Sequence, residues 1–145
     1  MTVKFESHIT EAIQKIQAES LERMEKAVIT VRDHTATKLT GQRTGRIYKV
    51  PGTQRTYTAS SPGEPPAIRL GDLKDSVKWT IETQGKEIIG KVGTDKEYGA
   101  RLEFGYHDTD SKGRRYNMAA RPWLQKSFDE TKDEVIAIFN RHMEL

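Results

Sequence analysis

The sequence predicts a single α+β domain over residues 1–145, with a long N-terminal helix, a small antiparallel β-sheet and a C-terminal helix packed on the sheet. Two observations lead to this prediction. Apolar residues recur every three or four positions in the first and last parts of the chain, which is typical of amphipathic helices. Between them, residues 76–94 alternate apolar and polar side chains, which is typical of half-buried strands. The chain therefore divides into residues 1–39, 40–70 and 71–145.

The first part, residues 1–39, is expected to form one helix from Phe5 to about Leu39. Its stripe steps by three or four residues and consists of Ile9, Ile13, Ile16, Ser20, Met24, Ala27 and Val31. No Gly or Pro occurs before Gly41, so the sequence carries no earlier helix stop. A helix of about 35 residues extends roughly 50 Å, which is longer than a domain of this size needs. We therefore expect it to bend, to break or to pack on neighbouring subunits.

The second part, residues 40–70, is basic and rich in Gly, Pro, Ser and Thr. No Asp or Glu occurs between His34 and Gly63. Five basic residues fall in that stretch, namely Lys38, Arg43, Arg46, Lys49 and Arg55. Residues 44–58 fit a β-hairpin that turns near Pro51-Gly52, and they fit an open loop equally well. We expect the following loop, with Pro62, Gly63, Pro65 and Pro66, to be stiff and extended, because each proline fixes its own φ.

The third part, residues 71–145, is expected to contain a β-hairpin and helices. A short helical turn with Asp72 as its candidate cap precedes a hairpin over residues 76–94, which turns at Gln84-Gly85. Residues 97–104 have helical spacing and end at Gly105, and residues 106–117 are expected to form a mobile polar loop. A C-terminal helix begins near Pro122. Its expected apolar face consists of Trp123, Leu124, Phe128, Val135, Ile138 and Phe139.

The composition excludes several classes of function. The chain has no cysteine, its four histidines lack metal-binding spacing, and no nucleotide-binding or hydrolase motif occurs. We therefore expect no enzyme activity, no metal, no cofactor and no small-molecule substrate. The first residues lack the apolar core of a signal peptide, and no apolar run is long enough to cross a membrane. Hydrophobic residues make up only 34% and charged residues 31%, which suggests that partners supply part of the stability.

Three sequence blocks together point to a family. They are residues 59–77 (ASSPGEPPAIRLGDLKDSV), residues 98–105 (YGARLEFG) and residues 120–124 (ARPWL). In this order and spacing they resemble the gene-product-ten family of tail-completion proteins of long-tailed, lambda-like phages and prophages. The resemblance covers nearly the whole chain and is most specific over residues 59–128. This chain departs from the commoner form by a long insertion at residues 106–117 and by Trp123, where phenylalanine is more usual.

The resemblance implies a structural subunit of the phage neck. Such a subunit assembles with copies of itself into a ring, expected to be hexameric, that links the tail tube to the head connector. Its other partners would be the connector or stopper and the tail terminator or tail-tube proteins. The protein would be made in the cytoplasm of the bacterial host and would end in the virion.

Three groups of residues are candidate contact or clamp sites. The basic residues Lys38, Arg43, Arg46, Lys49 and Arg55 fit contact with DNA in a channel, docking on an acidic protein, or a solvated loop. The first of these also supports an alternative function, a nucleic-acid-binding module that uses residues 38–55. The loop with Pro62, Gly63, Pro65 and Pro66 is expected to dock on a neighbouring subunit. Glu103 and Arg121 are expected to form an ion pair that clamps two helix ends, with Phe104 and Trp123 in the core beneath.

Overall fold

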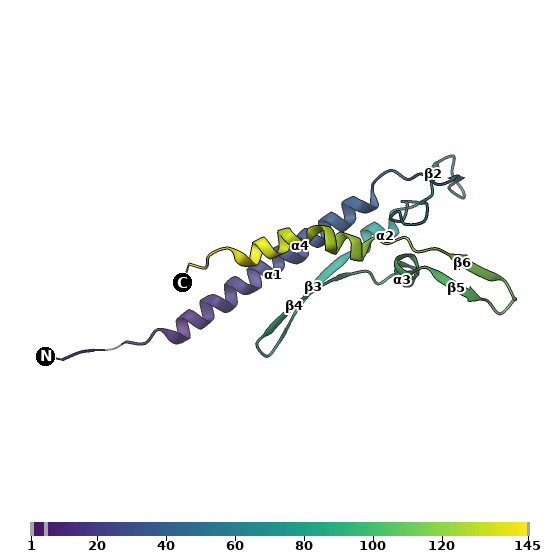
Figure 1. Ribbon diagram of the computed structural model, residues 1–145. Coiled ribbons are helices and arrows are strands. Elements are labelled where there is room, and N and C mark those ends of the chain that lie inside the picture. Colours follow the sequence, from purple (N-terminus) through teal and green to yellow (C-terminus); the bar gives the residue numbers. More distant parts are fainter. Residues whose placement is uncertain (1, 5, 145) are drawn as a thin grey trace.

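The computed structural model describes residues 2–4 and 6–144, and it confirms the predicted α+β class (Figure 1). The helices are α1 (Ile9–Leu39), α2 (Asp72–Asp75), α3 (Glu97–Phe104) and α4 (Leu124–Asn140). The strands are β1 (Ile47–Lys49), β2 (Thr56–Thr58), β3 (Lys78–Gln84), β4 (Glu87–Gly93), β5 (Tyr106–Thr109) and β6 (Arg115–Met118). Within the described residues these strands form three separate antiparallel hairpins, β1–β2, β3–β4 and β5–β6.

Helix α1 is the longest element of the chain and runs unbroken for 31 residues. It begins at Ile9, and the residue where the sequence placed its start, Phe5, lies outside the described residues. Burial starts only at Arg23 and continues through Ala27, Val28 and Val31 to Leu39. The first half of α1 therefore projects beyond the packed part of the molecule (Figure 1).

Helix α4 packs antiparallel along the second half of α1 (Figure 1). Three small hydroxyl side chains of the two helices are fully or almost fully buried, Thr35 of α1 and Ser127 and Thr131 of α4. Each hydroxyl donates to the carbonyl four residues earlier in its own helix, over 2.7 Å, 2.5 Å and 2.8 Å respectively. Because these hydroxyls have acceptors, burying them does not carry the cost of an unsatisfied polar group.

The predicted β3–β4 hairpin also packs on α1; Trp79 lies opposite Val92, and Gln84 pairs with Glu87 across a turn at Gly85-Lys86, one residue later than predicted. Gly90 of β4 lies so close to α1 that a Cβ there would come within 2.5 Å of both Met24 Sδ and Val28 Cγ1. At the end of this hairpin, Leu39, Leu73, Val77 and Trp123 form the main apolar core. One helix therefore supports both the hairpin and α4.

The two remaining hairpins settle one open alternative and correct one expectation, and the start of α2 corrects another. Residues 44–58 form the β1–β2 hairpin rather than an open loop. Residues 106–117, expected to be a mobile loop, form β5–β6 with a turn in which Asp110 accepts from the backbone N–H of Lys112 and of Arg114 at 2.9 Å. Asp72 was expected to cap α2, but Gly71 holds the cap position with φ +90°, a conformation that favours glycine.

We predict that Gly90→Ala lowers the free energy of unfolding by about 1–3 kcal/mol, because its methyl group overpacks the contact with Met24 and Val28. Gly93→Ala is the matched control in the same strand, since a Cβ there meets no atom within 4 Å. The control should change stability by less than about 0.5 kcal/mol. Urea unfolding followed by circular dichroism measures both variants, and equal midpoints for the two would contradict the close approach.

Candidate assembly surfaces

The N-terminus of α4 is capped by a side chain from another helix. The Glu103 carboxylate, at the end of α3, accepts hydrogen bonds from the backbone N–H groups of Trp123 (2.9 Å), Leu124 (2.9 Å) and Gln125 (3.1 Å). These are among the N–H groups that a helix start leaves without partners, and a negative charge there also interacts favourably with the helix dipole. α4 has no side-chain cap of its own. Glu103 therefore fixes where α4 begins and how it meets α3.

The predicted ion pair between Glu103 and Arg121 is wrong. Arg121 instead donates from Nε to Ser60 Oγ at 3.1 Å and from Nη1 to the Ala119 carbonyl at 2.8 Å. Three backbone donors already take up most of the acceptor sites of the Glu103 carboxylate, and the Arg121 guanidinium bonds to a different segment. The clamp between the two helix ends exists, but backbone N–H groups take the place of the arginine.

The two aromatic residues of this clamp differ in burial. Trp123 is 1% exposed, and its Nε1 donates to the Gly99 carbonyl at 3.2 Å, so its predicted place in the core is confirmed. Phe104 was predicted to lie beside it but is 80% exposed. It is the last residue of α3, where the chain turns away at Gly105, and the turn points its ring outward.

Arg23 is a structural residue that the sequence reasoning missed. Its side chain is buried, pairs with Glu19, and donates to the backbone carbonyls of Phe139 (2.7 Å) and His142 (3.2 Å) at the end of α4. A cation at a helix C-terminus satisfies free carbonyls and suits the dipole. The signal in the sequence was an arginine close to the buried stripe of α1, next to Met24 and four residues before Ala27.

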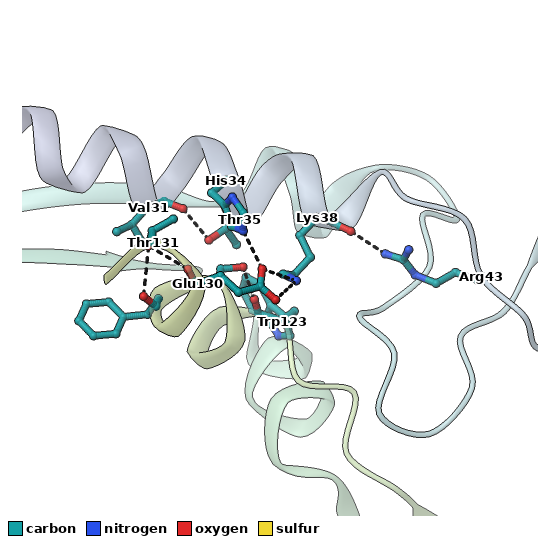
Figure 2. Close-up of polar contacts among 10 residues, drawn as sticks. Val31, His34, Thr35, Lys38, Arg43, Trp123, Glu130 and Thr131 are labelled. Carbon is teal, nitrogen blue, oxygen red and sulfur yellow. Dashed lines mark hydrogen bonds and ion pairs between the residues drawn. The ribbon is translucent and has the colours of Figure 1, made fainter. Parts of the chain in front are cut away.

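Two of the five predicted basic contact residues are used within the chain. Lys38 donates to the Glu130 carboxylate at 2.7 Å, and His34 lies 2.8 Å from the same carboxylate, which ties α1 to α4 (Figure 2). The hydrogen bond from Lys38, followed by that from His34, lowers the pKa of Glu130. Arg43 donates to the carbonyls of Lys38 (2.8 Å) and Pro65 (2.6 Å), and burial lowers the pKa of its guanidinium.

The other three basic residues, Arg46, Lys49 and Arg55, lie on or beside the β1–β2 hairpin and are exposed. Tyr48 and Tyr57 face each other across this hairpin with ring centroids 5.9 Å apart and stacked planes. Alternate residues of a strand share a face, so Arg46 and Arg55 lie on the side of the tyrosines. The hairpin therefore presents two arginines around a pair of aromatic rings.

The proline loop is fastened to the body of the protein. Glu64 accepts from the Ser61 N–H (2.8 Å) and from the Thr44 hydroxyl (2.7 Å), and these bonds lower the pKa of its carboxyl. Gly63 N–H donates to the Ala120 carbonyl at 3.1 Å. Pro66 is buried and Pro65 is half-buried, whereas Pro62 and Gly63 remain exposed. Only the tip of the predicted docking loop is free to meet a neighbour.

The chain exposes more surface than a compact monomer of the same mass. A compact monomer of 16.5 kDa exposes about 7,500 Å². This chain exposes 10893 Å², which is roughly 3,300 Å² above that scaling. Among the described residues, fifteen large apolar side chains are exposed while eight apolar side chains are buried. Exposed apolar side chains that gather into patches are typical of proteins that bind other proteins.

Two of the exposed apolar surfaces are continuous. The arm, residues 9–22 of α1, carries Ile9, Ile13 and Ile16, which are 67%, 50% and 39% exposed. The groove is an open hollow of about 590 Å³ between the β4 side and the α4 side of α1. Its apolar lining consists of Met24, Ala27, Val28, Val31, Gly90, Val92, Phe104, Leu124, Phe128, Val135 and Phe139.

The described residues contain neither a metal-binding cluster nor a membrane-spanning helix. No group of three or more His, Asp or Glu side chains there is arranged to hold a metal ion. Residues 2–4 and 6–144 also include no helix that is long and apolar enough to cross a membrane. No protein-family model matches the chain, and no curated protein or solved structure matches it.

We predict that Glu103→Ala and Arg121→Ala destabilise the protein independently of each other. Glu103→Ala should cost about 1–3 kcal/mol, because three N–H groups at the start of α4 lose their acceptor. The double variant should equal the sum of the single variants to within about 0.5 kcal/mol. Chemical unfolding of all four proteins measures this. A coupling energy well above that margin would contradict the independence of the two side chains.

Proposed function

We propose that this protein is a structural subunit of a phage neck, a tail-completion or head–tail joining protein that assembles into a ring between the tail tube and the head connector. It would act through protein–protein contacts and catalyse no reaction. Its partners would be further copies of itself, the connector or stopper, and the tail terminator or tail-tube proteins. It would be made in the cytoplasm of the bacterial host and incorporated into the virion.

The observation that carries this proposal is the excess surface of roughly 3,300 Å² over a compact monomer. Permanent protein assemblies bury about 2,000–5,000 Å² at an interface, so the excess has the size that an assembly subunit needs. Seven of the fifteen exposed large apolar residues lie on the arm or line the groove, and the other eight are spread over the rest of the described chain. A subunit built to be covered by neighbours accounts for both features.

The choice of a phage neck rests on the three sequence blocks. In the fold they meet at one place, which supports treating them as one signature. Gly63 of the first block donates to Ala120 of the third at 3.1 Å, and Arg121 N–H of the third donates to Leu102 of the second at 2.7 Å. Glu103 of the second block caps the helix that the third block begins. Residues that depend on one another in this way are expected to occur together in relatives with the same fold.

The decisive experiment deletes the gene from the phage or prophage that encodes it. We expect filled heads and finished tails that stay unjoined in electron micrographs, and restored particles when the wild-type gene is supplied in trans. Antibody labelling of the restored particles should mark the junction of head and tail. Joined, infectious particles made without the protein would rule the proposal out.

The second candidate function is nucleic-acid binding by the β1–β2 hairpin. The observation that favours it is the face that combines Arg46 and Arg55 with the stacked rings of Tyr48 and Tyr57. Guanidinium groups pair with phosphates, and aromatic rings stack on bases that are not paired. Lys38 and Arg43 no longer count toward this function, because both are held within the chain.

The nucleic-acid candidate predicts that Arg46→Ser with Arg55→Ser weakens binding to a single-stranded oligonucleotide at least tenfold. The slope of log affinity against log salt should also fall by about 1.4, since each lost phosphate contact removes about 0.7 for single strands. The control variant is Lys126→Ser with Lys132→Ser, which removes the same charge from exposed positions of α4. Fluorescence anisotropy measures the affinities, and equal losses in both variants would reject a specific role for the hairpin.

A further inference from the structure

The arm of α1 is an amphipathic helix that leaves its isoleucines exposed in its own subunit. None of residues 9–22, all of which the structure describes, is buried. Ile9, Ile13 and Ile16 follow one another at intervals of four and three, so they form one line along the helix. A run of 14 helical residues extends about 21 Å, or nearly four helical turns. This spacing of anchors is the one that helices use when they bind in apolar grooves.

The groove is a mostly apolar hollow that stays open between the described elements of its own subunit. Its floor is the second half of α1, from Met24 to Val31, and its two sides come from β4 and α4. α4 and the β3–β4 hairpin both pack on α1, and the hollow lies where they part. Phe104 and Phe128, on α3 and α4, line this hollow although they are 80% and 49% exposed.

The arm cannot fill the groove of its own chain. The same continuous helix forms the arm and, further along, the floor of the groove, with no break between Ile9 and Leu39. An unbroken helix does not fold back on itself, because kinks require a proline, a glycine or an inserted group in its hydrogen-bond ladder. The arm lacks both Gly and Pro. Any arm that fills the groove therefore comes from a second copy of the chain.

We propose that the arm, residues 9–22 of one subunit, binds in the groove between β4 and α4 of the next subunit. This inference rests on the proposed function and names the contact through which the subunits join. The excess surface of roughly 3,300 Å² is large enough for each subunit to give an arm to one neighbour and a groove to the other. Because the two surfaces differ, the contact is head-to-tail, and repeating it produces a ring when the rotation closes.

The test uses two variants that each remove one half of the contact. Ile13→Glu with Ile16→Glu disables the arm, and Phe104→Glu with Phe128→Glu disables the groove. All four residues are at least 39% exposed, so the variants should fold, which circular dichroism verifies. The control is Ile47→Glu with Ile136→Glu, which places the same charges at positions that are 72% and 45% exposed and lie outside both surfaces.

Light scattering after size-exclusion chromatography should give oligomers for the wild type and the control, and monomers for the arm variant and the groove variant. An equimolar mixture of the two variants should give a mass twice that of the monomer, because one intact arm still finds one intact groove. A different result would overturn the proposal: the groove variant assembles like the wild type, and the mixture gives no dimer. The arms of two subunits would then bind each other instead of the groove. A wild type that stays monomeric at every concentration also overturns the proposal.

These outcomes are independent of the test of the neck function. Unjoined heads and tails after gene deletion, together with a wild-type protein that is monomeric, would leave the function standing and reject the arm-in-groove contact. Joined particles without the gene, together with a mixture that pairs as expected, would reject the neck function and keep the contact.

Discussion

The fold depends on α4 being held at both ends by side chains that belong to other parts of the chain. Glu103 accepts three N–H groups at its start, and Arg23 donates to two carbonyls at its end. Both charges have the sign that the helix dipole favours, and Lys38 and His34 add a central tie through Glu130. Since α4 has no side-chain cap of its own, these contacts decide its position on α1. The Trp123 core and the groove follow from that position.

The sequence was sufficient to predict the helices and strands whose apolar residues recur at a regular spacing. The long helix, the β3–β4 hairpin, α3 and α4 all follow from spacing that one element contains, and Trp123 in the core follows from its place at the start of α4. The β5–β6 hairpin did not follow, because its turn is set by Asp110 binding two backbone N–H groups rather than by an apolar pattern. Phe104 was misplaced because periodicity cannot tell where the chain leaves a helix end.

In the basic stretch, residues 38–55, the sequence likewise does not reveal which charged side chains have partners within the chain. The sequence does not distinguish the five basic residues of this acid-free segment from one another. In the structure, Lys38 pairs with a carboxylate 92 residues away, and Arg43 binds carbonyls of the proline loop. Their partners come from distant segments, so no local signal separates them from Arg46 and Arg55. The pairing of Glu103 with Arg121 failed for a related reason. Opposite charges at two helix ends suggest an ion pair, but free backbone N–H groups at a helix start compete for the same carboxylate.

Because α1 is one unbroken helix, the side on which Ile9, Ile13 and Ile16 lie is fixed relative to the rest of the subunit. Each residue of a helix turns it by about 100°, so one residue inserted between Ile16 and Arg23 would swing the isoleucines about a quarter of the way around the axis. Seven inserted residues would return them to nearly the same phase about 10 Å further out. Related chains that keep this line usable should therefore differ in length at this point by steps such as seven or eleven residues, which nearly restore the phase.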